Sequence, residues 1–347
     1  MNEFLENRFN ITRRHFLGNM TAGIGSLALG SLLVPDLFKG DGSDADALPL
    51  GMPHFAPKAK RVIYLFQNGA PSQLESFDYK PTLIKMMGQD LPASVRMGQR
   101  LTGMTSQQKK FPLVGSFYKF NQYGQSGAWV SELFPHMASI VDEMCIIKSM
   151  HTEAINHEPA ITYMQTGNQV TGRPCLGAWL SYGLGSLNQN LPTFVVLVAR
   201  STNVEQVQAI SARLWQSGYL SGEHSGVSFR SAGDPILYIN NPPGVPSEIR
   251  RRTLDAVRQL NEMNYERVGD PETHTRIQQF EMSFRMQASV PDLTNIASEP
   301  ESTFRLYGEQ ARNPGSFANT VLLARRMVER GVRFIQVYHN NWDTHGN

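Results

Sequence analysis

Residues 316–338 read SFANTVLLARRMVERGVRFIQVY, a helix pattern at 316–330 that runs directly into a strand pattern. Apolar side chains recur at the spacing of one helix face, at Phe317, Val321, Ala324 and Val328. Gly331 is placed to end the helix, because glycine readily adopts the left-handed conformation that follows a last helical turn. Residues 332–338 are then almost continuously apolar, which is typical of a strand covered on both faces. A helix followed by a buried strand indicates an α/β fold.

The same alternation extends through the rest of the chain. Short apolar runs predict three further strands, at 61–66, 145–147 and 192–198. Periodic segments with start signals or many charges predict helices at 131–141, 174–182, 247–267 and 272–287. Strands separated by helices favour a mostly parallel sheet with right-handed crossovers. Residues 215–245 interrupt the pattern with Gly, Pro, Ser and Asn, and we expect a loop or hairpin excursion there rather than a second domain.

The N-terminus has the layout of a twin-arginine export signal. Arg13 and Arg14 precede a weakly apolar stretch at 18–34, and the residues ADA at 45–47 supply a small-residue cleavage site. An amphipathic surface helix is the disfavoured alternative, because the polar residues of that stretch are small and form no charged face. We therefore expect residues 1–47 to be a signal peptide that the twin-arginine export machinery carries to the periplasm or cell envelope. The stretch is too short and too rich in glycine for a stable transmembrane span.

Charge and cysteine content exclude some partners. The formal net charge is +2, and acidic and basic residues are intermixed, so no basic run could follow a phosphate backbone. We expect no nucleic-acid partner. The two cysteines, Cys145 and Cys175, lie neither in a CxxC pair nor at zinc-ligand spacing from a histidine. Cys145 lies in an apolar run, and we expect it to be a small buried side chain.

Polar residues that could form a site follow the last expected strand. Ligands of open parallel sheets bind at the carboxyl ends of the strands. Asp343 and His345 are two positions apart, so an extended backbone places a carboxylate and an imidazole on one side. This pair is half of a catalytic metal shell. A helix cap at Asp343 and a surface position for His345 remain the alternative.

A second group of candidate ligands follows the expected strand at 145–147. It comprises His151, Glu153, His157 and Glu158. These residues could be metal ligands, or His151 could be buried and hydrogen-bonded while both glutamates cap the next helix. Residues 67–73, after the first strand, add a glycine-bearing turn. Polar residues follow three expected strands, and this favours a single site at which the three strand ends meet.

Several motifs together resemble those of an exported bacterial family known as domain of unknown function 1501. They include TRRHFL, KRVIYLFQNGAPSQLESFD, SMHTEAINHEPAITYMQTG, GRPCLGAWLSYGLGS and GVRFIQVYHNNWDTHG, and the likeness covers residues 12–347. That family is grouped with the sulfatase and alkaline phosphatase superfamily. The resemblance implies a three-layer α/β/α sandwich of the alkaline phosphatase type, with 48–347 as a sulfatase-like domain. It also implies a divalent metal ion for cleaving sulfate or phosphate esters.

The resemblance implies roles for particular residues. It implies four metal ligands: Asp343, His345, His157 and His151. Asn68 and Arg173 become contacts for the anionic group of the substrate, and Ser72 is either a nucleophile or a helix cap. Residues 69–73 are similar to the sulfatase signature, but Gly69 replaces its cysteine and Gln73 its arginine. Formylglycine is therefore not expected.

Relatives continue beyond the Trp-Asp-Thr-His-Gly motif with further acidic and histidine-bearing segments. The resemblance therefore implies a C-terminally truncated fragment that lacks the last strands and is inactive by itself. Two functional classes stay open for the complete protein. One is a metal-dependent hydrolase acting on a small-molecule or polysaccharide ester. The other is a catalytically inactive envelope or carbohydrate-binding protein on the same scaffold, which would account for the missing strand-end Asp at 67–69.

Overall fold

The computed structural model describes residues 58–98, 101–103, 105–200, 210–230, 232–237 and 239–343. The expected signal peptide at 1–47 and the candidate ligand His345 lie outside these residues, so both stay predictions. Within the described ranges, no helix is both long enough and apolar enough to cross a membrane.

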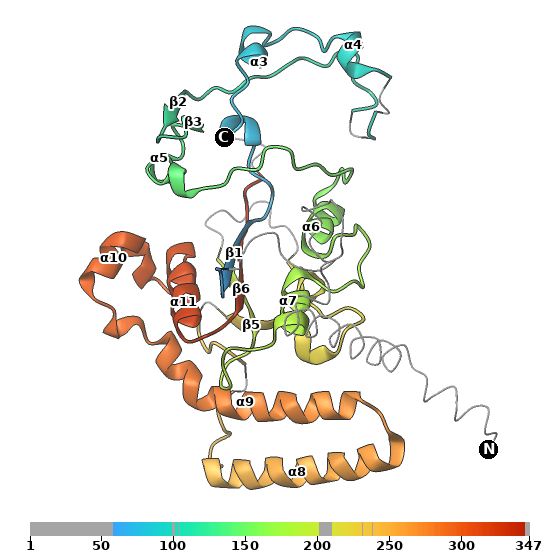
Figure 1. Cartoon of the computed structure of the whole chain (residues 1–347), viewed down its shortest axis with the longest axis vertical. Helices are drawn as coiled ribbons and strands as arrows, with labels where there is room; N and C mark the ends of the chain where they lie inside the picture. The colour runs from blue at the N-terminus through green and yellow to red at the C-terminus, as the bar shows by residue number, and fades with distance from the viewer. Residues whose placement is uncertain are drawn as a thin grey trace, which may run out of the picture. The chain divides into compact units, whose positions relative to one another are not determined.

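Four strands form one parallel sheet (Figure 1). They are β1 (Val62–Gln67), β4 (Phe194–Ala199), β5 (Val227–Arg230) and β6 (Phe334–His339), in the spatial order β1-β6-β4-β5. Every neighbouring pair runs parallel, with Gln67 opposite His339 and Val198 opposite Tyr338. The predicted α/β class, the mostly parallel sheet and the strands near 61–66, 192–198 and 332–338 are confirmed.

Helices pack on both faces of the sheet, because its two central strands carry apolar side chains in both directions. On one face, Val195 and Ile335 pack with residues of α9 (Glu272–Thr294) and α11 (Phe317–Glu329). On the other face, Phe194 and Tyr338 pack with residues of α6 (His157–Thr166) and α7 (Leu176–Leu184). Figure 1 shows α11 and α7 on opposite sides of β6. Complete burial of a side chain such as Ile335 stabilises the fold by roughly 2 kcal/mol.

Helix boundaries follow local signals. Ser316 caps α11, where its hydroxyl accepts a hydrogen bond from the Asn319 N–H at 3.0 Å. Gly331 follows that helix with a φ of +87°. Gly269, with a φ of +71°, ends α8 (Ser247–Val268) in the same way, and α9 returns beside it as a helical hairpin (Figure 1). The predicted helices near 174–182, 247–267, 272–287 and 316–330 are confirmed.

Buried polar contacts fix the helices to their neighbours. Gln336 of β6 donates from Nε2 to Gln165 of α6 and to the Tyr338 hydroxyl, the latter at 2.8 Å. Arg326 of α11 donates from Nε to the Leu293 carbonyl at the end of α9, at 2.8 Å. All these side chains are buried. Leaving one such partner unsatisfied would cost about 1–3 kcal/mol.

The remaining elements are short. β2 (Phe120–Tyr123) and β3 (Ala128–Ser131) form an antiparallel pair. The other described α-helices are α3 (Pro81–Lys85), α4 (Ala93–Arg96), α5 (Pro135–Ala138) and α10 (Glu301–Tyr307). Two short 3-10 turns matter below: η2 (Gln73–Glu75) follows β1, and η5 (Gly222–His224) precedes β5.

Two predicted elements are wrong. Residues 145–147 form no strand, and Cys145 and Ile147 are exposed rather than buried. A three-residue apolar run is too short to determine burial, which depends on tertiary packing. The helix expected at 131–141 begins only at Pro135. Proline lacks an N–H and is tolerated in the first turn of a helix but not in its interior.

The segment at 215–245 is largely irregular, as expected, but it also contributes β5 to the edge of the sheet. This parallel strand was not expected from the sequence. Phe229 is buried, whereas Ser228 and Arg230 on either side of it are exposed. This alternation is typical of a half-covered strand, and four residues among Gly, Pro and Ser give a weak sequence signal.

Candidate functional site

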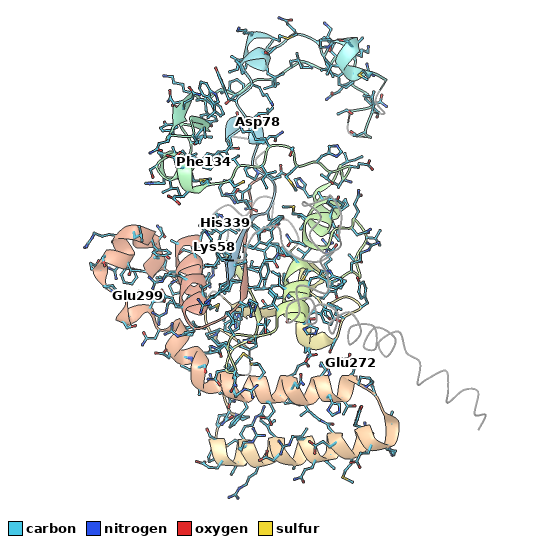
Figure 2. All side chains as sticks on the ribbon, viewed as in Figure 1. Lys58, Asp78, Phe134, Glu272, Glu299 and His339 are labelled. Carbon is cyan, nitrogen blue, oxygen red and sulfur yellow. The ribbon has the colours of Figure 1, made fainter. Side chains whose placement is uncertain are left out.

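The carboxyl ends of β1 and β6 lie side by side, and backbone hydrogen bonds join the turns that follow them. Asn68 donates its N–H to the His339 carbonyl at 2.7 Å, and Trp342 donates its N–H to the Asn68 carbonyl at 3.0 Å. The parallel register is the reason, because it sets Gln67 opposite His339 and ends both strands at one edge. Figure 2 labels His339 at this edge.

Gly69 lets these two turns approach closely. Its φ is +110°, and a Cβ there would lie 2.4 Å from the Asp343 nitrogen and 3.0 Å from the Trp342 nitrogen. Both the backbone conformation and the contact require glycine. Ala70 and Asn341 also have positive φ, of 64° and 69°. Such conformations in non-glycine residues cluster at functional sites, which makes the paired turns a candidate site.

The His157 and Asp343 side chains are in direct contact at this site. His157 Nε2 lies 2.9 Å from Asp343 Oδ2. His157 opens α6, and Gln165 near the other end of this helix bonds to Gln336 of β6, so the helix is held along the strand that leads to Asp343. The His157 side chain is 46% exposed and that of Asp343 18%. The structure therefore brings together two of the four residues implied as metal ligands.

Buried amide groups without partners occur in the same turns. Asn68 is fully buried, and its Nδ2 donates to Asn340 Oδ1 at 2.9 Å. Its Oδ1 has no hydrogen-bond partner within the described ranges, and neither do the buried Oδ1 and Nδ2 of Asn341. Buried polar atoms nearly always have partners. These orphaned oxygens therefore mark a place for a partner that the described part of the polypeptide does not supply.

The donor atoms are compatible with a divalent cation. Two ligand atoms on one octahedral ion are about 3 Å apart, close to the 2.9 Å between His157 Nε2 and Asp343 Oδ2. Carboxylate and amide oxygens with one imidazole suit ions that accept both oxygen and nitrogen ligands, such as Mn²⁺ or Zn²⁺. No group of three or more His, Cys, Asp or Glu side chains is placed to hold a metal ion in the part of the chain that the structure describes. Further ligands would come from the Asn68 and Asn341 oxygens or from the undescribed His345.

A cavity of about 540 Å³ opens at these turns. Ser72 and Glu75 line it from the segment after β1, and Asn341 and Asp343 line it from the segment after β6. Phe134, labelled in Figure 2, closes part of the wall. Small-molecule sites have volumes of roughly 300–1,000 Å³. The cavity therefore has the size of an ordinary ligand site.

His339 is held in one orientation on the wall of this cavity. Its ring stacks on Phe317 with centroids 4.4 Å apart, and its Nδ1 accepts a hydrogen bond from Trp342 Nε1 at 3.1 Å. Burial lowers the pKa of His339, so the imidazole is neutral at pH 7. With Nδ1 as the acceptor, the proton of the neutral ring resides on Nε2. That N–H can donate to a ligand oxygen.

The other implied site residues do not all reach the cavity. Ser72 lines it and occupies the N-cap position of η2, as the cap alternative expects, but its hydroxyl makes no capping hydrogen bond there. Arg173 is exposed and does not line the cavity. His151 is also exposed and outside it, which corrects the alternative of a buried His151. Glu158 lies in the first turn of α6 and pairs with Arg213 at 3.0 Å.

Sequence reasoning missed His339 and the two asparagines that follow it. His339 could have been found, because aligning 61–66 with 332–338 as parallel neighbours places it beside Gln67 at the strand ends. The role of Asn341 had no such signal. Its positive φ and its buried amide arise from the packing of two turns that are far apart in the sequence.

A protein-family model described as "Protein of unknown function (DUF1501)" matches residues 59–347. Searches of curated proteins and of solved structures found no match. The matched range includes every strand of the parallel sheet and both turns of the site.

Proposed function

This chain belongs to the DUF1501 family of proteins of unknown function, and we propose that it is an exported, metal-dependent hydrolase of sulfate or phosphate esters. The contact between His157 and Asp343 carries the proposal, because it lies where β1 and β6 deliver their carboxyl ends. For the fold, we propose the three-layer α/β/α sandwich of the alkaline phosphatase type. Helices on both faces of the parallel sheet support it.

His157 and Asp343 would hold the divalent ion, with the orphaned oxygens of Asn68 and Asn341 as further donors. His345, outside the described residues, would be another ligand. A bound ion would supply Lewis-acid polarisation of a sulfuryl or phosphoryl oxygen. Gly69 and the backbone bonds of Asn68 keep the two turns in place around these donors.

Asn341 and Asp343 line the cavity, whereas His157 and Asn68 lie behind its lining, and further residues of the wall would bind and orient the ester. Ser72 has an exposed hydroxyl on the wall and is the proposed nucleophile. His339 is neutral and fixed between Phe317 and Trp342, so its Nε2–H would donate to the leaving-group oxygen. Arg173 has no part in this arrangement. The cavity size fits a small ester or one sugar unit of a polysaccharide ester.

We also propose export through the twin-arginine pathway to the periplasm or cell envelope. The order of Arg13-Arg14, the weakly apolar 18–34 and the ADA site at 45–47 supports it. Replacing both arginines with lysine should retain the protein in the cytoplasm in a cell-fractionation experiment. Undiminished export of the double-lysine variant would contradict this part of the proposal.

One observation favours the alternative of an inactive envelope or carbohydrate-binding protein. The first strand leads to the amide Asn68 rather than to a carboxylate. A neutral amide attracts a divalent ion less strongly than an anionic carboxylate does. A weakly held ion would leave a protein that binds its ligand without turnover.

Hydrolysis of p-nitrophenyl sulfate and p-nitrophenyl phosphate by the purified complete protein separates the two functions. Hydrolysis should require an added divalent metal, stop with EDTA and fall at least about 100-fold in Ser72→Ala. Ser289→Ala, a partly exposed serine of α9, is the matched control and should keep the wild-type rate. Metal binding without hydrolysis of any ester would favour the inactive alternative, and hydrolysis that survives EDTA would contradict the metal requirement.

A further inference from the structure

A second cavity, of about 760 Å³, lies at the other end of the sheet, where the strands begin. Phe194 and Val227, the first residues of β4 and β5, line it. The His157–Asp343 contact, in contrast, lies where strands end. A six-residue strand is about 20 Å long, so the two sites are separate. The second cavity is walled by residues of α7, the η5 loop and α9.

The wall of the second cavity is fixed by its own hydrogen bonds. Ser181 Oγ of α7 lies 3.1 Å from His224 Nδ1. The Ser221 hydroxyl lies 2.8 Å from that of Thr275, which joins the η5 loop to α9. Burial lowers the pKa of His224 against the opposing effect of Glu223, so the ring is neutral at pH 7. A neutral imidazole beside hydroxyl groups offers both donors and acceptors to a ligand.

The positive and negative charges on the wall of the second cavity offset each other. Glu281 is already engaged by Arg251 of α8, whose Nη2 lies 2.6 Å from Glu281 Oε1. The other charged side chains that line the cavity, Glu223 and Arg285, have opposite signs. A wall without an excess of one charge does not attract a highly charged ligand. The wall therefore favours a neutral ligand rich in hydrogen-bonding groups.

Exposed aromatic rings adjoin the second cavity. Trp179 and Tyr182 of α7 and Tyr219 form an aromatic cluster, in which Trp179 lies 6.2 Å from Tyr182 and 6.0 Å from Tyr219 between ring centroids. These residues are 43%, 49% and 65% exposed, respectively. Tyr182 also contacts the His224 ring edge-to-face at 5.5 Å, which joins the cluster to the cavity wall. Neighbouring exposed rings beside a cavity mark a binding surface.

We propose that the second cavity and the aromatic cluster form a binding groove for a neutral polysaccharide. A sugar ring has apolar C–H faces, which pack on aromatic rings, and hydroxyl groups at its edge, which need both donors and acceptors. Trp179 and Tyr219 meet the first requirement, and Ser181, His224 and Gln278 meet the second. The groove goes beyond the proposed hydrolysis, because binding at this end of the sheet requires neither the metal nor turnover.

Affinity electrophoresis of the full chain tests the groove. Native gels would contain laminarin, xylan or galactomannan as neutral polymers and dextran sulfate as the charged one. At least one neutral polymer should retard the protein, and Trp179→Ala or Tyr219→Ala should raise its Kd about tenfold. Gln278→Ala, an exposed residue of the cavity, should also weaken retardation. Tyr163→Ala is the control, because Tyr163 is 40% exposed but lies outside the cluster.

Circular dichroism and thermal unfolding establish that each variant is folded. Retardation by no neutral polymer, equal retardation of Trp179→Ala and wild type, or retardation by dextran sulfate alone would overturn the groove. So would conversion of a dimer to a monomer by Trp179→Ala without any polysaccharide binding, which would identify the cluster as a protein interface. Ring-dependent retardation of a protein that hydrolyses no ester would support the groove and count against the proposed hydrolase.

Discussion

His157 Nε2 lies 2.9 Å from Asp343 Oδ2, although one residue opens a helix and the other follows a strand on a distant part of the chain. Two local structural features make this contact possible. Gly69 lets the turn after β1 pack against the backbone of Asp343. Gln165 and Gln336 join α6 to β6. The tertiary packing therefore brings His157 and Asp343 together, and each of the two features can be tested separately.

Replacing Gly69 with alanine should disturb the turns more than the same change at another glycine with positive φ. Gly88→Ala adds strain alone, because no atom lies within 4 Å of its added Cβ, and it should cost about 1 kcal/mol. Gly69→Ala adds a collision with the Asp343 nitrogen and should cost about 1–3 kcal/mol more. Urea unfolding measures both. Equal losses of stability would mean that the turns are not tightly packed.

A carboxylate at position 68 should make stability depend on metal. Asn68 is fully buried, so Asn68→Asp places an uncompensated charge there and should cost several kcal/mol in EDTA. Added Mn²⁺ should restore much of the lost thermal stability if an ion binds beside this oxygen. Asn264→Asp, on the exposed side of α8, is the control. A Tm of Asn68→Asp that does not respond to metal would place the ion elsewhere.

Glu299, labelled in Figure 2, should contribute its full stability only above its unfolded pKa. Burial raises the pKa of Glu299, but hydrogen bonds from Arg325 and Arg326 outweigh burial and hold it below the ordinary value of 4.5. The contribution is therefore complete at pH 7 and disappears as the pH falls below about 4.5 through the lowered pKa of the folded state. Glu299→Gln should cost about 2–3 kcal/mol at neutral pH, and the difference from wild type should shrink in acid.

Glu329→Gln is the matched control for that experiment. Glu329 also approaches Arg325, at 3.4 Å, but its side chain is 56% exposed. An exposed ion pair of this kind contributes between about 0 and 1 kcal/mol. Urea titrations at several pH values would give the free energies of unfolding. A difference between Glu299→Gln and wild type that stays constant with pH would show that the carboxylate charge is not the source of the stability.

The buried amides Gln165 and Gln336 should behave as a coupled pair. Gln336→Leu removes the donor to Gln165, and Gln165→Leu leaves Gln336 bonded to the Tyr338 hydroxyl but not to α6, so each change should cost about 2 kcal/mol. The double leucine variant removes both polar groups and should lose at least about 1 kcal/mol less than the sum of the single losses. A double-mutant cycle by urea unfolding measures the coupling. Strict additivity would mean that this contact does not join α6 to β6.

The buried strands could be predicted because their sequences are continuously apolar. Residues 334–338 of β6 and nearly all of β4 are buried on both faces of the sheet, so their burial is visible in the sequence as an apolar run. Edge strands carry less of that signal, and β5 has Phe229 as its one fully buried side chain. Cys145 and Ile147 show the converse error, because apolar residues can lie on the surface when no element covers them.

The place of the site could be predicted, but its composition could not. Parallel strands end at one edge, and this rule alone places Asn68 and Asp343 near each other. The partner of Asp343 depends on how α6 packs, so spacing in the sequence could not separate His157 from His151. The positive φ of Asn341 could not be predicted either, because nothing in the surrounding sequence requires it.

The metal content of the purified protein tests the central claim, that His157 and Asp343 hold a divalent ion. Mass spectrometry for metals after dialysis should find close to one ion per wild-type chain, and His157→Ala and Asp343→Ala should each lower the affinity about tenfold or more. His136→Ala, an exposed histidine of α5, should keep the ion. Wild-type metal content in both His157→Ala and Asp343→Ala would contradict the claim.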